Sequence, residues 1–159
     1  MWWDFLKEWK IIDASNLILG RLATYVAKMA LMGNNIIIIN SKDVKISGNR
    51  NNILQHYYQY KNIKTRSNPR RGPFRVGTRP DVFILKTIRP MLPKNMRGSI
   101  AFKRIHAYIS DIPEYKKSKY ERITKIEVPN DISAEKLNCR YVSVEDVCIR
   151  IGWNKGGLK

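Results

Sequence analysis

The sequence predicts an α/β fold with a parallel sheet, and three neighbouring segments carry that prediction. Residues 10–14 (KIIDA) have the composition of a short buried strand, residues 19–30 repeat apolar side chains at helical spacing, and residues 36–39 are four consecutive isoleucines. A strand, a helix and a strand in this order form a βαβ unit. We therefore expect two parallel strands joined by a right-handed crossover.

The helix of this unit is predicted by Leu19, Leu22, Ala23, Val26 and Ala30, which recur at i, i+3, i+4, i+7 and i+11. These positions share one face of a helix, while Arg21, Thr24 and Lys28 lie opposite. Gly33 follows at the place where glycine commonly ends a helix. The isoleucine run after it indicates a strand that is covered on both faces.

The remaining elements follow in chain order. We expect an extended piece over residues 43–52, a tyrosine-rich helix over 53–60, a helix over 81–92, a short helix over 97–104 and a strand over 105–109. A turn at 112–113, a basic loop at 116–119 and a last strand over 123–128 come next. Ser143 is a plausible N-cap for a final helix with Val144, Val147, Cys148 and Ile151 on one face. Because the sequence shows no internal repeat and no interdomain linker, residues 1–159 are expected to form one domain.

The charge balance indicates a polyanionic partner. The 159 residues hold 30 Lys and Arg against 13 Asp and Glu, a formal net charge of +17. The candidate partners are nucleic acid, an anionic membrane surface or an acidic protein. No apolar run approaches the roughly 20 residues that span a bilayer, and Asp4 and Glu8 interrupt the N-terminus, so neither a membrane span nor a signal peptide is expected.

Most of the excess charge lies between residues 61 and 104, where thirteen Lys and Arg accompany a single acid, Asp81. A solvated surface normally mixes both signs, so a segment of this kind favours phosphate neutralisation. At its centre, residues 67–80 (SNPRRGPFRVGTRP) combine arginine with proline and glycine, which disfavour both helix and central strand. Arginine suits phosphate because its planar guanidinium can grip two oxygens.

Aromatic side chains accompany these cations. Phe74 and the cluster Tyr57, Tyr58 and Tyr60 offer rings on which unpaired bases can stack. Helical spacing makes core packing the better interpretation for at least two of the three tyrosines.

No catalytic, cofactor or metal site is predicted, and no small-molecule substrate. His56, His106, Cys139 and Cys148 lack metal-ligand spacing, and the cysteines are expected to be free thiols in a reducing compartment. The carboxylates Asp13, Asp43 and Asp81 are not paired for acid–base work. Gly20 alone does not make a nucleotide-binding loop.

Four motifs occur together in one order: IIDASNLILGRLATYVAKMAL, KISGNR, NPRRGPF and IRPMLPKNMRGSIAFKRIHAYI. Over about residues 10–115 this order resembles the L-thirteen family of large-ribosomal-subunit proteins, in its archaeal and eukaryotic form. Two positions depart from the family pattern, since Pro90 and Ser110-Asp111 stand where glycine is usual.

The resemblance implies a three-layer α/β/α sandwich around a small, mostly parallel four-stranded sheet, with a basic arginine-, proline- and glycine-rich extension. It implies a structural, non-catalytic protein that binds large-subunit rRNA and supports subunit assembly and translation on cytoplasmic ribosomes. Neighbouring large-subunit ribosomal proteins are expected partners, on one of which Trp2, Trp3 and Phe5 could dock. An enzyme acting on RNA and a DNA-binding regulator stay as alternatives, although neither a cofactor pocket nor a helix-turn-helix is visible.

The motifs of the resemblance and the charge of the basic segment together give the candidate rRNA contacts. They are Ser47, Gly48, Asn49, Arg50, Lys64, Arg66, Asn68, Arg70, Arg71, Gly72, Phe74, Arg75, Arg79, Lys86, Arg89, Lys94, Arg97, Lys103 and Arg104.

Overall fold

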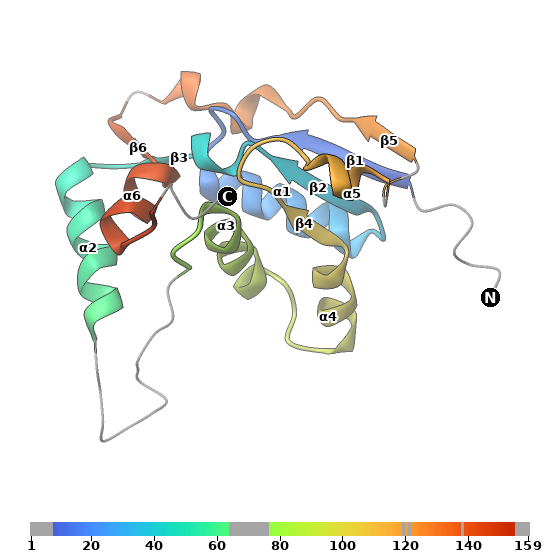
Figure 1. Ribbon diagram of the computed structural model, residues 1–159, viewed down its shortest axis with the longest axis horizontal. Helices are drawn as coiled ribbons and strands as arrows, with labels where there is room; N and C mark the ends of the chain where they lie inside the picture. The colour runs from blue at the N-terminus through green and yellow to red at the C-terminus, as the bar shows by residue number, and fades with distance from the viewer. Residues whose placement is uncertain (1–7, 64–76, 119, 121, 138, 155–159) are drawn as a thin grey trace.

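The computed structural model describes residues 8–63, 77–118, 120, 122–137 and 139–154. In chain order its elements are β1 (Glu8–Asp13), α1 (Leu19–Leu31), β2 (Asn35–Ile39), η1 (Ser41–Asp43), β3 (Lys45–Ser47), α2 (Arg50–Asn62), α3 (Pro80–Ile88), η3 (Arg89–Met91), α4 (Met96–Lys103), β4 (Ile105–Ala107), α5 (Glu114–Lys117), β5 (Arg122–Lys125), η4 (Asn130–Ile132), η5 (Ala134–Lys136), β6 (Tyr141–Ser143) and α6 (Val144–Ile151). Figure 1 shows their arrangement.

The main sheet has four strands in the order β4-β2-β1-β5, and each neighbouring pair is parallel. In the central pair, Ile11 lies opposite Ile37 and Ile12 opposite Ile38. The predicted βαβ unit is therefore confirmed, and so is the α/β class with its small, mostly parallel four-stranded sheet.

The isoleucines of β2 face two separate clusters because successive side chains of a strand point to opposite sides. Ile36 and Ile38 pack with residues of α1, α3 and α6 in the larger cluster, which includes Leu22 and Ile84. Ile37 packs on the other face with Trp9 and Tyr120 in a smaller cluster. Helices α1, α3 and α4 thus cover one face. Among the described residues, the segment around the one-turn helix α5 alone covers the second face, so this part of the sandwich is thin.

The two amphipathic helices form where apolar spacing predicts them. Helix α1 buries Leu19, Leu22, Ala23, Val26, Ala27 and Ala30, and Gly33 after it has a positive φ of 99°. Helix α6 begins after Ser143, whose side chain accepts a hydrogen bond from the Asp146 backbone N–H at 3.2 Å. It ends at Gly152, which is left-handed with φ 108°.

Several element boundaries differ from the predictions for local reasons. Helix α2 begins at Arg50 rather than at residue 53, because the Asn49 side chain caps it by accepting from the Asn51 backbone N–H at 3.1 Å. Helix α3 ends at Ile88, and Pro90 lies in the 3₁₀ turn that follows it. Residues 114–117 form the short helix α5, part of which was predicted as a loop.

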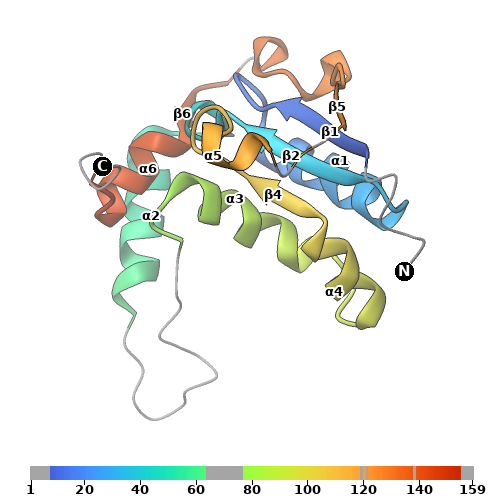
Figure 2. The same cartoon turned by 45° about the vertical axis from the view of Figure 1, so that its right-hand side comes forward.

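The last strand is β6 rather than the predicted strand over 123–128, which β5 (Arg122–Lys125) covers only at residues 123–125. Strand β6 pairs antiparallel with β3, and Ile46 lies opposite Val142. This two-stranded sheet brings α2 and α6 together, and they lie side by side in both Figure 1 and Figure 2. Trp2, Trp3 and Phe5 lie outside the described residues. No helix in the described part of the chain has the length and apolar composition of a membrane span.

Candidate nucleic-acid interface

The predicted rRNA contacts fall into described and undescribed parts of the chain. Lys64, Arg66, Asn68, Arg70, Arg71, Gly72, Phe74 and Arg75 lie outside the described residues. The others belong to two places in the fold, the α3–η3–α4 segment and the turn from β3 into α2.

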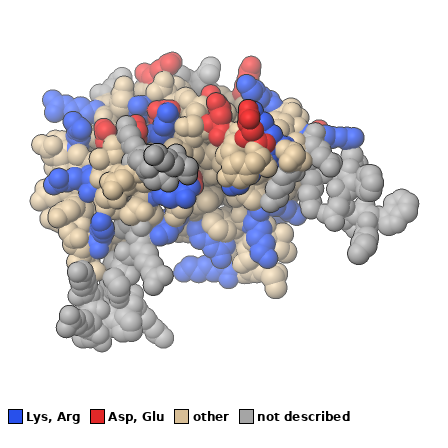
Figure 3. All heavy atoms as spheres, viewed as in Figure 1, with Lys and Arg blue, Asp and Glu red and all other residues tan. Residues whose placement is uncertain are grey.

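The outer side of α3, η3 and α4 carries five of the predicted rRNA-contacting cations that the structure describes. Lys86, Arg89, Lys94, Arg97 and Lys103 are all exposed, and we call them the α3–α4 basic surface. In Figure 3, Asp and Glu gather in the upper part of the view, while Lys and Arg are spread over the whole face and are seen without Asp or Glu beside them in the lower part, over α3 and α4. One side of the molecule therefore presents positive charge with little opposite charge beside it.

Helix α4 is held against the turn before it by close backbone packing at Gly98. A Cβ atom added there would lie 1.9 Å from the Pro93 carbonyl oxygen, far inside any allowed contact. The Asn95 side chain caps the same helix by accepting from the Gly98 backbone N–H at 3.1 Å. Gly98 therefore serves packing, and its contribution is to place Arg97 and Lys103.

Arg89 is fixed by two contacts with α4. Its guanidinium carbon lies 5.1 Å from the centre of the Phe102 ring, and its Nη1 donates to the Gly98 carbonyl oxygen at 3.4 Å. A guanidinium stacked on an aromatic ring keeps its charge. The side chain is thus pre-oriented and still exposed to solvent.

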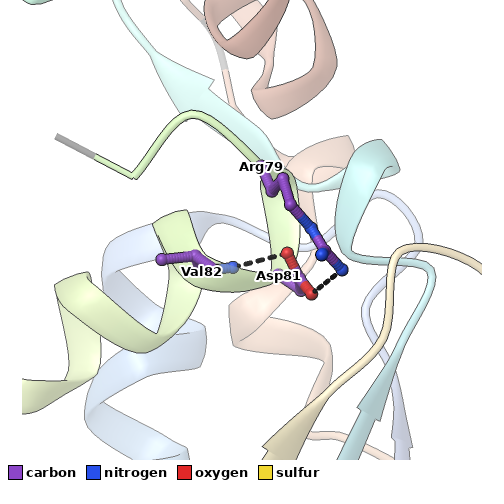
Figure 4. A network of polar contacts seen from close by, with 3 residues as sticks. All are labelled: Arg79, Asp81 and Val82. Atoms are coloured by element: carbon purple, nitrogen blue, oxygen red, sulfur yellow. Dashed lines mark hydrogen bonds and ion pairs between the residues drawn. The ribbon is translucent and has the colours of Figure 1, made fainter. Parts of the chain in front are cut away.

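Arg79 is engaged with the one acid of the basic segment. Its Nη2 lies 2.8 Å from Asp81 Oδ2, and Asp81 Oδ1 accepts from the Val82 backbone N–H at 2.8 Å (Figure 4). Asp81 therefore stabilises the first turn of α3 and holds Arg79 at the same time. Part of the charge of Arg79 is already compensated inside the protein.

Arg104 is only half-exposed, at the end of α1. Its Nη1 is 3.5 Å from the position that a Cβ would take on Gly33, the residue that follows the C-terminal turn of α1. A cation near a helix C-terminus is stabilising because the carbonyl end of the helix is partly negative. This arrangement gives Arg104 a structural role beside the predicted rRNA contact.

The turn from β3 into α2 contains the motif Ser47-Gly48-Asn49-Arg50. Gly48 has a φ of 132°, which only glycine adopts readily, and its N–H donates to the Arg140 carbonyl oxygen at 2.7 Å. Arg50 is exposed and lies 3.7 Å from Asp146 of α6. The motif therefore joins α2 to the C-terminal part of the chain.

A groove between α2 and α6 escaped the sequence analysis. It has a volume of about 590 Å³ and is lined by Asn51, Leu54, Gln55, Tyr58, Gln59 and Arg150, which we call the α2–α6 groove. The guanidinium carbon of Arg150 lies 5.1 Å from the centre of the Tyr58 ring. The local sequence gives no signal for this site, because Arg150 lies far from α2 along the chain.

The tyrosines of α2 correct one prediction. Only Tyr57 packs against the core, with its ring centre 5.2 Å from that of Phe83. Tyr58 and Tyr60 have exposed fractions of 44% and 37%, so the expected core packing of at least two of the three is wrong. The ring of Tyr60 stacks on His56 at 6.1 Å.

Lys61 ties the far ends of α2 and α6 together. Its Nζ donates a hydrogen bond to the carbonyl oxygen of Ile151, the last residue of α6. The side chain thus satisfies a carbonyl that has no partner within the helix and places a positive charge at the negative end of the helix. Lys61 is the first cation of the basic segment over residues 61–104, but here it caps the C-terminal end of α6.

The carboxyl ends of β1 and β5 border an open cavity of about 570 Å³, the place where parallel sheets commonly bind ligands. Burial pushes the pKa of Asp13 up, but hydrogen bonds from Asn40 and Ser15 lower it by more, so that this pKa lies below its ordinary value. Asp13 Oδ1 accepts from the Ser15 N–H, the Ser15 hydroxyl and the Asn40 amide. The carboxylate therefore links the ends of β1 and β2, which is a structural role.

The two cysteines are unpaired and sit in different surroundings. Cys139 is exposed, whereas Cys148 is buried on the inner face of α6. Burial raises the pKa of Cys148 to about 12, which keeps the thiol neutral at pH 7. Within the described ranges, no three His, Cys, Asp or Glu side chains come together as a metal ion would require.

Comparison with known proteins places these features in a family. A family model described as "Ribosomal protein L13" matches residues 7–114. The chain is 31% identical to the "Large ribosomal subunit protein uL13" of Sulfolobus acidocaldarius over 96% of this chain and 97% of the relative. The proteins of the same name from Methanocaldococcus jannaschii and Methanopyrus kandleri are 43% and 45% identical over 64% and 65% of this chain. The matches span 74% and 63% of those two relatives.

Proposed function

Because the chain belongs to the ribosomal protein L13 family, we propose that it is a structural constituent of the large ribosomal subunit that binds large-subunit rRNA. The family is one of structural ribosomal proteins, so the prediction that the chain is not an enzyme is confirmed. Binding of rRNA would support folding of the RNA during subunit assembly. The protein would accordingly work on cytoplasmic ribosomes, next to other large-subunit proteins.

The α3–α4 basic surface is the observation that supports rRNA binding best. Its five cations are exposed on α3, η3, α4 and the turn between η3 and α4, and the two helices are packed against the core through Ile84, Ile88 and Ala101. Their spacing is therefore set before RNA arrives, which reduces the ordering entropy that binding costs. Exposed Lys and Arg at fixed positions suit neutralisation of phosphates along a folded RNA.

Recognition would depend mainly on the shape of the RNA. The deep, narrow major groove of A-form RNA admits little base reading by side chains, so contacts to phosphates and sugars dominate. Arg89, oriented by Phe102, is suited to one phosphate at a defined position. Within this proposal, all nineteen candidate residues remain predictions, including those between residues 64 and 76.

Titration of binding against salt tests the proposal. The full chain is mixed with large-subunit rRNA fragments, and the dissociation constant is measured between about 50 and 300 mM KCl. With about eight phosphate contacts, log affinity should fall with log salt at a slope of roughly −6 to −7. Replacing Arg70, Arg71 and Arg75 together by alanine should flatten that slope without lowering the melting temperature.

Fractionation of source cells on a sucrose gradient provides the second measurement. The proposal expects the protein in the large-subunit fractions and in the assembled ribosome. Absence from those fractions, together with salt-independent binding to rRNA, contradicts it. Turnover of labelled S-adenosylmethionine on transcript RNA would instead support the alternative of an RNA-modifying enzyme.

A further inference from the structure

We propose that the α2–α6 groove binds one unpaired base of the RNA, stacked on Tyr58 and read at its edge by amide side chains. This inference rests on the proposed function, since it concerns the same RNA partner. It adds a contact that does not depend on phosphate neutralisation. It also involves α6, which lies outside the region matched by the family model.

The chemistry of the groove lining carries the proposal. Asn51, Gln55 and Gln59 supply three amides, each with both a donor and an acceptor, and Tyr58 and Arg150 supply two planar groups. Unpaired bases in RNA are recognised by this combination, namely stacking on aromatic rings or guanidinium planes and hydrogen bonds at the base edges. The described side chains that line the groove include no acid.

The size and rigidity of the groove agree with a single nucleotide. Its volume of about 590 Å³ lies within the range of roughly 300–1,000 Å³ that is typical of small-ligand pockets. The two helices that form it are joined near both ends, by Arg50 with Asp146 and by Lys61 with the Ile151 carbonyl. A base can therefore enter without first ordering the groove.

The position of the groove favours RNA over a protein partner. Gln59 lies in the last turn of α2, and that helix ends at Asn62, directly before the arginine-rich residues 64–76. An RNA strand held by those arginines would pass close to the end of α2. Tyr and Arg are also common in protein interfaces, so a protein occupant is the outcome that the experiment must separate.

A hairpin RNA with one bulged 2-aminopurine is the probe for the full-length protein. The same hairpin without the bulge is the reference. Stacking on Tyr58 should quench the fluorescence of 2-aminopurine and favour the bulged hairpin over the paired one. Because stacking rather than charge carries this preference, the ratio of the two affinities should stay constant from about 50 to 300 mM KCl.

Substitutions in the groove test which side chains produce the preference for the bulged hairpin. Tyr58→Ala should reduce the preference for the bulged hairpin by at least about fivefold, the lower end for loss of one base-stacking contact, and Tyr58→Phe should keep it. Gln55→Ala should reduce the differences in binding affinity among hairpins that carry A, G, C or U in the bulge. Tyr115→Ala is the matched control, since Tyr115 also lies against a cation, Lys116, but at another site and with an exposed fraction of 78%.

The following results support or overturn the base pocket. Equal binding of bulged and paired hairpins by the wild type, or an unchanged preference in Tyr58→Ala, overturns the base pocket while leaving rRNA binding intact. If the wild-type protein shows no salt-dependent binding to either hairpin, this result instead contradicts the proposed function. In intact large subunits, a photo-crosslink from a photoreactive residue at position 58 to RNA supports the pocket. A crosslink from that position to a protein overturns it.

Discussion

The α3–α4 basic surface and the helices α2 and α6 around the groove both carry Lys and Arg, but these side chains differ in what they contact. On the α3–α4 basic surface, Lys94, Arg97 and Lys103 extend into solvent. At the α2–α6 groove, Arg50 faces a carboxylate, Lys61 a helix carbonyl and Arg150 an aromatic ring. The cations around the groove therefore each have a partner on another element, as Arg89 has in Phe102, whereas Lys94, Arg97 and Lys103 face solvent.

Under the two proposals, this difference separates two ways of binding RNA. Solvent-exposed cations give affinity that depends steeply on salt, because each phosphate contact releases counterions. Cations that are engaged inside the protein contribute little to that dependence, and a region built on them must bind through stacking and hydrogen bonds. The two regions are accordingly expected to respond differently to salt and to substitution.

The largest expected effect comes from removing charge on the α3–α4 basic surface. Replacing Lys94, Arg97 and Lys103 together by alanine should weaken rRNA-fragment binding about 100-fold at 0.1 M salt and make the slope less steep by about 2–3. The melting temperature should stay the same because all three side chains are exposed. Salt-dependent filter binding and thermal denaturation measure the two quantities.

A matched triple variant controls for the loss of net charge. Lys117, Arg122 and Lys125 are equally exposed but belong to α5 and β5. Replacing them by alanine should change the slope by much less. Equal loss in both variants would mean that overall charge matters rather than the α3–α4 basic surface.

Gly98→Ala tests whether the α3–α4 basic surface depends on its packed support. The added methyl group would overlap the Pro93 carbonyl oxygen, so α4 must shift, at a cost of about 1–3 kcal/mol in the free energy of unfolding. Binding of rRNA should also weaken, because Arg89 and Arg97 move with the helix. Denaturant unfolding monitored by circular dichroism gives the stability change.

Gly20→Ala is the natural comparison for that variant. Gly20 lies in the first turn of α1, and nothing stands within 4 Å of an added Cβ. Alanine there should stabilise the protein by about 0.4–1 kcal/mol through the entropy of the unfolded chain. Destabilisation of both variants to the same extent would argue against a specific contact at Gly98.

Lys61→Met should give the smallest effect, and it tests whether a cation that caps a helix also contributes to RNA binding. Loss of the hydrogen bond to the Ile151 carbonyl and of the cation at the end of α6 should lower the free energy of unfolding by about 0.5–1.5 kcal/mol. The salt slope of rRNA binding should not change. A slope that flattens by about 0.7–0.9 with unchanged stability would instead place Lys61 among the phosphate contacts.

The fold was largely predictable from the sequence, because its main signals are local. The apolar spacing of α1 and α6, the isoleucines of β2 and the stop at Gly33 each depend on neighbouring residues, and the structure has them in place. Helix starts were less predictable, since α2 begins three residues early through the cap at Asn49. The resemblance to a ribosomal-protein family was equally readable, because it follows from the order of motifs.

The sequence by itself therefore determined the α/β class, the family and the concentration of positive charge between residues 61 and 104. Only the tertiary structure decided which cations are available, because their partners are distant: Lys61 meets Ile151, and Arg50 meets Asp146. The pairing of β3 with β6 was also hidden, since strands of three residues are too short for a clear alternation. That pairing joins segments almost one hundred residues apart and creates the α2–α6 groove, a site that no local pattern can specify.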